Sequence, residues 1–312
     1  MDWRESPAQL DRARAEVPVT VPSPHGLLFG VYTPPSPAAP AAGRCAVLFT
    51  RPRAHRNRIW VLGARHLAAR GFSAFRFDYH GSGDSEGEMS FLDPNRPYRD
   101  DADAVLRFLR ERFGEHRFIV YGMCFDARTA LSAFEHGAAA IDGLAFFASP
   151  VMELDTLVKA RADHKGPGHL LRALGNPGNW QALGRPGRWR YMATVVGRIA
   201  RRAVPGGAPR NDTPLSDGFV RHFRALVRSG ARALFVYGED DAEYVSFKVA
   251  LATVFEKLTP AERARIEVDI WPGDVHGFLN MPVQRRTVER TLAWIEAFHP
   301  AGTTTAANGT PS

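Results

Sequence analysis

The chain has 312 residues, of which 45% are hydrophobic and 23% charged, so it is long enough to bury a sizeable core. No hydrophobic run approaches the roughly 18–20 residues that a membrane-spanning helix needs, which argues against an integral membrane protein. The first residues lack a hydrophobic signal core, and the chain has only two cysteines. We therefore expect a cytoplasmic protein without a disulfide framework or a cysteine-built zinc site.

The formal net charge of +7 comes from one segment. Residues 151–211 contain 11 Arg or Lys and three acidic residues, a net charge of +8, and the rest of the chain is close to neutral. Such a segment can bind nucleic acid or a membrane surface, or attract an acidic substrate or carrier. Codon preference is an alternative explanation, because only four of the 40 basic residues are lysines.

Short hydrophobic runs alternate with segments of helical periodicity along most of the chain. Val17–Val21 and Leu27–Tyr32 are β-prone runs separated by a Pro- and Gly-containing turn, which predicts a hairpin. The later predicted strands are Cys45–Phe49, Phe72–Phe77, Phe118–Tyr121, Ile141–Ala148, Ala233–Tyr237 and Ile266–Ile270. The predicted helices are Ile59–Arg70, Asp101–Phe113, Ala127–Glu135, Phe219–Arg228, Tyr244–Lys257 and Val283–Phe298. This alternation predicts an α/β protein with a mostly parallel sheet covered on both faces.

The alternation is interrupted once. Residues 151–215 read as Gly- and Pro-punctuated helical pieces, so we expect a basic helical insertion over one end of the sheet. The predicted core is then formed by residues 17–150 and 216–299. We expect a flexible N-terminus over residues 1–16 and a disordered tail over residues 300–312.

The segment Phe118–Ala127 predicts a strand that passes through Gly-Met-Cys-Phe into a helix. A nucleophile on such a sharp turn is lifted above the sheet edge and faces the helix N-terminus, whose free N–H groups favour negative charge. The same field stabilises a thiolate, which makes Cys124 a candidate nucleophile. The alternative is that Cys124 is a small buried hydrophobic residue, as most single cysteines are.

Two further candidates follow later strands. The strand Ala233–Tyr237 continues into Gly-Glu-Asp-Asp, which places Asp240 and Asp241 just beyond its carboxyl end. The strand Ile266–Ile270 continues into a loop that contains His276. A nucleophile, an acid and a histidine in this chain order, each after a strand, are typical of one hydrolase architecture.

That order resembles the α/β-hydrolase superfamily over about residues 20–299, and is closest to the serine aminopeptidase-like hydrolases, including the exosortase-associated group. Residues 66–87 are similar to the family's helix, strand and Gly-rich loop. The resemblance implies the α/β-hydrolase fold, with residues 151–215 as a helical lid. It also implies an esterase-, thioesterase- or acyl transferase-like enzyme with a catalytic triad, and no metal or cofactor.

Two positions depart from the family pattern. The family usually has serine where this chain has Cys124, and glycine or another small residue where it has Asp126. Asp126 either complements the helix dipole or places a negative charge near Cys124 that lowers its reactivity.

Chemistry assigns a role to each candidate of the triad. Cys124 attacks an acyl carbon and His276 accepts its proton, while a carboxylate holds the imidazole in the right tautomer. The spacing Gly-x-x-Asp favours Asp241 as this carboxylate, with Asp240 as the alternative.

An oxyanion hole needs two backbone N–H donors. We expect Phe125, directly after the nucleophile, to supply one of them. The other is expected from the loop that follows the strand Cys45–Phe49, where Pro52 has no N–H and Arg53 is therefore the candidate.

An acyl-cysteine is itself a thioester, so ester, lactone or thioester substrates suit this nucleophile better than peptides. The basic segment could dock coenzyme A phosphates or an acidic acyl carrier protein. One alternative is a non-hydrolytic member of the fold, such as a cyclase, an eliminating enzyme of natural-product biosynthesis or a small-ligand binding protein. Another is nucleic-acid binding by the basic segment, although no recognised motif supports it.

Overall fold

The computed structural model describes residues 16–50, 53–54, 58–88, 98–137, 140–152, 215–276 and 280–298. The predicted flexible N-terminus, the basic helical insertion and the predicted disordered tail fall almost wholly outside these residues.

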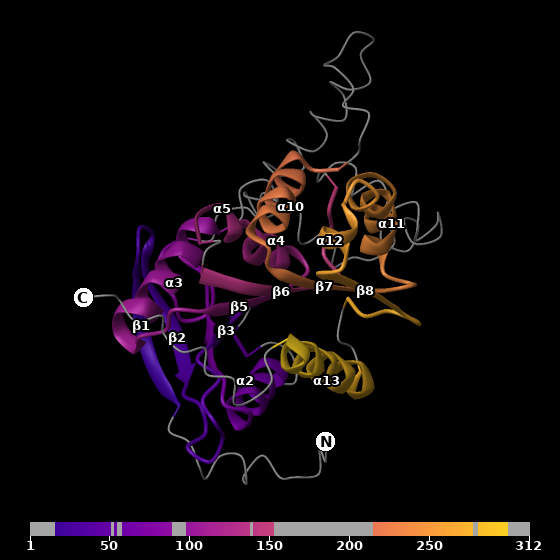
Figure 1. Ribbon diagram of the computed structural model, residues 1–312. Coiled ribbons are helices and arrows are strands. Elements are labelled where there is room, and N and C mark those ends of the chain that lie inside the picture. The colour runs from indigo at the N-terminus through magenta and orange to yellow at the C-terminus, as the bar shows by residue number, and fades with distance from the viewer. Residues whose placement is uncertain are drawn as a thin grey trace, which may run out of the picture.

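An eight-stranded sheet forms the centre of the core, in the order β1-β2-β4-β3-β5-β6-β7-β8 (Figure 1). The strands are β1 (Val17–Ser23), β2 (Gly26–Thr33), β3 (Cys45–Phe49), β4 (Ser73–Phe77), β5 (Phe118–Met123), β6 (Ile141–Phe147), β7 (Arg232–Gly238) and β8 (Ile266–Trp271). The neighbouring strands from β4 through β3, β5, β6 and β7 to β8 run parallel to one another. Strands β1 and β2 form an antiparallel hairpin, and β2 pairs antiparallel with β4. The predicted hairpin and the mostly parallel sheet are thus confirmed.

Helices cover both faces of the sheet (Figure 1). Helices α2 (Ile59–Ala69) and α13 (Met281–Phe298) lie on one face, and α3 (Arg99–Phe113), α4 (Phe125–Ser132), α5 (Phe134–Gly137), α10 (Asp217–Ser229) and α11 (Ala242–Ala250) lie on the other. A π-helical turn (Leu251–Phe255) extends α11, and the short helix α12 (Pro260–Arg263) precedes β8. None of the helices in the described part of the chain is long and hydrophobic enough to cross a membrane.

Two hydrophobic layers follow from this arrangement. Every residue of β3 and β5 is buried, as expected for central parallel strands, whose side chains meet helices on both faces. The larger layer contains Phe146 and Phe235 from the sheet and Phe223 from α10. The smaller layer, on the other face of the sheet, contains Trp60 from α2 and Trp294 from α13.

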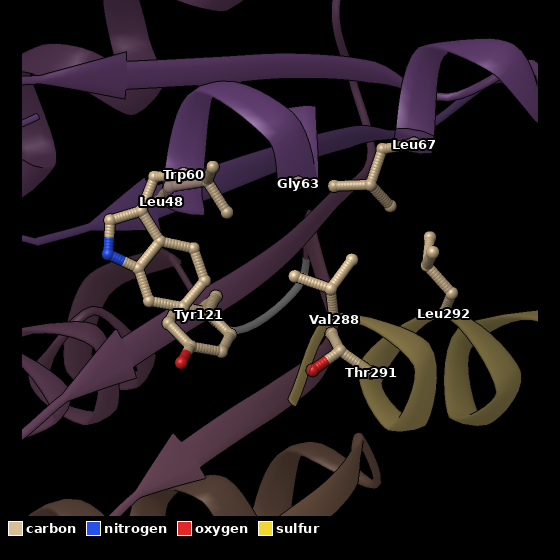
Figure 2. Close-up of a pocket in the computed structure, with 8 residues that line it drawn as sticks. All are labelled: Leu48, Trp60, Gly63, Leu67, Tyr121, Val288, Thr291 and Leu292. Carbon is tan, nitrogen blue, oxygen red and sulfur yellow. The ribbon is translucent and has the colours of Figure 1, made fainter. Parts of the chain in front are cut away.

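A small cavity lies within the smaller layer, between α2, α13 and the strands β3 and β5 (Figure 2). It is partly open to solvent and is lined by Leu48, Trp60, Gly63, Leu67, Tyr121, Val288, Thr291 and Leu292. The lining is almost wholly hydrophobic, and neither Cys124 nor His276 contributes to it. We interpret it as a packing gap in the core.

Arg128 on α4 is fully buried and connects distant parts of the chain. Its guanidinium donates hydrogen bonds to the Pro150 carbonyl (3.0 Å) and to Ser216 Oγ (2.6 Å). Pro150 follows β6, and Ser216 caps α10 by accepting a hydrogen bond from the Phe219 N–H. Arg128 therefore connects the two described segments on either side of residues 153–214.

We expect Arg128→Met to lower the free energy of unfolding by about 3 kcal/mol, because the charged donor is lost while its buried acceptors remain. Urea unfolding followed by circular dichroism measures the change. Arg224→Met on the exposed face of α10 is the matched control and should alter stability by less than about 0.5 kcal/mol. Equal stability of the two variants would show that Arg128 does not fasten these segments.

Candidate active site

The candidate nucleophile occupies a strained turn between β5 and α4. Cys124 has φ 53° and ψ −135°, an unusual conformation for a residue other than glycine, which costs about 1–3 kcal/mol. A Cβ atom on Gly122 would lie 2.4 Å from the Ala127 Cα atom, so only glycine lets the helix pack this close to the strand. Strain at this position and a conformation that lifts the side chain out of the sheet are features expected of a nucleophile.

The helix that follows begins earlier than the sequence predicts. The predicted helix Ala127–Glu135 is divided into α4, which starts at Phe125, and the short α5. Because α4 starts directly after Cys124, that residue is its N-cap and its sulfur lies beside the helix N-terminus. Asp126 is buried in the first turn, where a carboxylate complements the helix dipole.

The structure brings Cys124 and His276 together. The Nε2 atom of His276 lies 3.0 Å from the Sγ atom of Cys124, although the residues are 152 positions apart in the chain. The His276 side chain is about one-third exposed and Cys124 is half-buried. A base within hydrogen-bond reach of a thiol can accept its proton, so the pair has the geometry of an activated nucleophile.

The Asp241 carboxylate organises the loop that carries His276. Its Oδ1 atom accepts hydrogen bonds from the backbone N–H groups of Val275 and His276, both at 2.8 Å, and its Oδ2 atom accepts one from Gly238 at 2.6 Å. A Cβ atom on Gly238 would lie 2.2 Å from the Gly273 carbonyl oxygen, so the loops after β7 and β8 are in close contact. Asp241 thus holds the backbone of His276 in place from a neighbouring strand end.

The two aspartates considered from the sequence lie in different environments. Asp241 is buried, whereas the neighbouring Asp240 is exposed and uses its backbone N–H to bind the Gly273 carbonyl at 3.1 Å. Burial raises the pKa of Asp241 to about 7, although its three backbone N–H donors favour the ionised form. A contact with the Asp274 side chain is a second cause of this increase in pKa.

The two predicted oxyanion donors also differ in their placement. Phe125 is the first residue of α4 and lies next to Cys124. The Arg53 N–H instead donates to Asp78 Oδ1 at 2.8 Å, and the Arg53 guanidinium binds Asp78 and Asp84. The prediction that Arg53 supplies the second donor is not supported, because a buried carboxylate already occupies its N–H.

One buried carboxylate near the site is absent from the sequence-based prediction. Glu243, in the first turn of α11, has a side chain only 2% exposed, and its Oε1 atom lies 3.8 Å from His276 Nε2. Its position two residues after Asp241, in the first turn of the helix that follows β7, is the signal in the sequence that could have drawn attention to it.

The sheet order and the helices on both faces define the α/β-hydrolase fold, as solved structures bear out. The Pyrococcus furiosus esterase Pf2001 aligns with a TM-score of 0.57 at 12% identity, covering 94% of this chain and 95% of that one. The proline iminopeptidase of Mycobacterium smegmatis aligns with a TM-score of 0.53 at 16% identity, covering 91% and 98%. The Xanthomonas campestris α/β serine hydrolase XC6422, described as lacking a lid, aligns with a TM-score of 0.51 at 15% identity, covering 92% and 96%.

A narrower likeness comes from the sequence. Residues 47–179 match the family described as serine aminopeptidase, S33. No curated protein matches the chain. The match includes β5 and the turn with Cys124, whereas Asp241 and His276 lie beyond it.

The raised pKa of Asp241 predicts a dependence of stability on pH. The folded protein retains a proton on Asp241 up to about pH 7, whereas the unfolded chain releases it near pH 4, so raising the pH through 7 favours unfolding. Between pH 5.5 and 8.5 the free energy of unfolding of the wild type should fall because of Asp241. In Asp241→Asn this fall should be smaller by about 2 kcal/mol. Urea titrations at both pH values measure it. Asp240→Asn should retain the wild-type dependence, and the same flattening in both variants would contradict the assignment to Asp241.

Proposed function

We propose that this protein is a hydrolase or acyl transferase that acts on an ester, lactone or thioester through a covalent acyl-Cys124 intermediate. The observation that carries the proposal is the 3.0 Å contact between Cys124 Sγ and His276 Nε2 at a strained strand-to-helix turn. An esterase, a peptidase and a serine hydrolase among the structures of the same fold support the reaction class.

The geometry supports the following sequence of steps. The Cys124 proton passes to His276 Nε2, and the thiolate attacks the substrate's carbonyl carbon to form a tetrahedral oxyanion. The bond to the leaving oxygen or sulfur breaks, and His276 returns the proton to the departing group. Water or another acceptor then gives its proton to His276 and attacks the acyl-cysteine, which releases Cys124.

Two features of the turn favour the charged species in these steps. The thiolate forms beside the N-terminus of α4, where free N–H groups and the helix dipole stabilise negative charge. The Phe125 N–H is the proposed first oxyanion donor, because it belongs to the residue directly after the nucleophile. Asp241 keeps the His276 loop in register with the turn through its backbone hydrogen bonds.

The identity of the nucleophile favours activated acyl donors. Transfer from a thioester to Cys124 exchanges one thioester for another, so it is nearly balanced in energy, whereas transfer from an amide is uphill. We therefore propose esters, lactones and thioesters as substrates rather than peptides. Acyl groups carried by coenzyme A or an acyl carrier protein suit the net charge of +8 on residues 151–211, which attracts anionic groups.

The alternative is a protein of this fold that binds a small ligand or catalyses cyclisation or elimination. The departure of Cys124 and Asp126 from the usual family residues keeps this function open. It predicts ligand binding, or a change in the ligand, without an acyl adduct on the protein.

The proposal is tested by mass spectrometry of the intact protein in single turnovers with acyl esters and acyl-coenzyme A thioesters. We expect a transient mass increase equal to the acyl group, located on Cys124 by peptide mapping. Cys124→Ala should abolish both the adduct and turnover without unfolding the protein, and Cys124→Ser should retain part of the activity.

Buried Cys45 provides an internal reference in the same spectra, because a specific reaction leaves it unmodified. Full turnover by Cys124→Ala, or an adduct on another residue, would contradict the proposed nucleophile. Product formation without any adduct would favour the alternative function.

A further inference from the structure

A second buried carboxylate faces the catalytic histidine. Glu243 Oε1 lies 3.8 Å from His276 Nε2, the same nitrogen that lies 3.0 Å from the Cys124 sulfur. Asp241, in contrast, is hydrogen-bonded to the backbone N–H of His276. Within the described part of the chain, Glu243 is therefore the carboxylate at ion-pair distance from the imidazole ring. Asp241 instead binds the backbone of the loop that carries His276.

The placement of Glu243 is specific. An acidic residue in the first helical turn is common, because it complements the helix dipole, but that effect does not require burial. The Glu243 side chain is almost completely buried, and a buried carboxylate is costly unless a cation or hydrogen-bond donors compensate it. A protonated His276 ring at ion-pair distance supplies such a cation.

Neighbouring hydrogen bonds fix the backbone that carries this carboxylate. The Glu243 carbonyl accepts a hydrogen bond from Ser246 Oγ at 2.6 Å, which fixes the first turn of α11. Ser246 Oγ also accepts a hydrogen bond from the Val151 N–H at 3.4 Å, which links α11 to the segment after β6. Glu243 also affects Tyr237. The pKa of Tyr237 is raised mainly by burial and, to a smaller extent, by the negative charge of Glu243.

We propose that Glu243 is a positioning residue that stabilises the positive charge of His276 while that ring carries the proton taken from Cys124. The inference rests on the proposed role of the Cys124–His276 pair. Only one proton moves in this step, from Sγ to Nε2, and Glu243 exchanges none. Its contribution is the attraction between opposite charges about 4 Å apart in a largely buried site.

The test must distinguish the effect of Glu243 on His276 from the effects of the other charged and titratable groups that face this residue. The groups that face His276 are Cys124 from the turn after β5, Glu243 from α11, and Asp241 with its contact to Asp274 from the loops after β7 and β8. Glu243→Gln removes one charge and keeps the shape of the side chain. Glu243→Asp keeps the charge. As a control, Glu239→Gln removes an exposed carboxylate from the loop between β7 and α11.

The measurement is the rate at which iodoacetate alkylates Cys124 as a function of pH, read as mass increase of the intact protein. Iodoacetate is an anion, so it reacts fastest while the neighbouring ring is positively charged, and the rate falls at high pH when the ring loses its proton. Removing the Glu243 charge should move this alkaline limb to lower pH, because the positive ring loses a nearby negative charge. Glu243→Asp should remain near the wild type, and Glu239→Gln should match it.

An alkaline limb in Glu243→Gln that coincides with the wild type would overturn the inference. If Gln disturbs the packing, Glu243→Met removes the same charge with a hydrophobic side chain of similar length, and the same shift is expected. The readout does not require turnover. An active Cys124→Ala variant would therefore refute the proposed nucleophile, whereas an unshifted limb would refute only the role of Glu243.

Discussion

The candidate site depends on the carboxylate of Asp241, which bridges two neighbouring strand ends. By accepting three backbone N–H groups, it fastens the loop after β8 to the end of β7. This contact presents His276 to a cysteine that arrives from β5, two strands away from β7 in the sheet. It adds to the backbone hydrogen bonds from Glu239 to Trp271 and from Asp240 to Gly273, and it acts on the residue whose Nε2 lies 3.0 Å from the Cys124 sulfur.

The two acids contact different parts of His276. In a conventional triad one carboxylate both orients the imidazole and compensates its charge. Here Asp241 contacts the backbone of His276, and Glu243 lies within ion-pair distance of the ring itself. The raised pKa of Asp241 is consistent with a group whose chief contribution is the geometry of the loop.

The fold and the meeting of Cys124 with His276 could be predicted from the sequence, because carboxyl ends of parallel strands share one edge of the sheet. The preference for Asp241 over Asp240 rested on spacing, and the structure buries the Asp241 carboxylate against the backbone of His276, whereas Asp240 is exposed. The direction of the Arg53 N–H could not be predicted, since it depends on Asp78, which is 25 residues away in the chain. Glu243 was missed because a first-turn acid is ordinary in a sequence, and only packing reveals its burial beside the ring.

The most direct test of the central claim is the reactivity of Cys124 in the native protein toward iodoacetamide near pH 6, measured against a free thiol and against buried Cys45. If His276 activates the sulfur, Cys124 should react at least ten-fold faster than the free thiol, and His276→Asn should abolish this excess in a folded protein. Reaction of Cys124 at the rate of the free thiol, unchanged in His276→Asn, would contradict an activated cysteine.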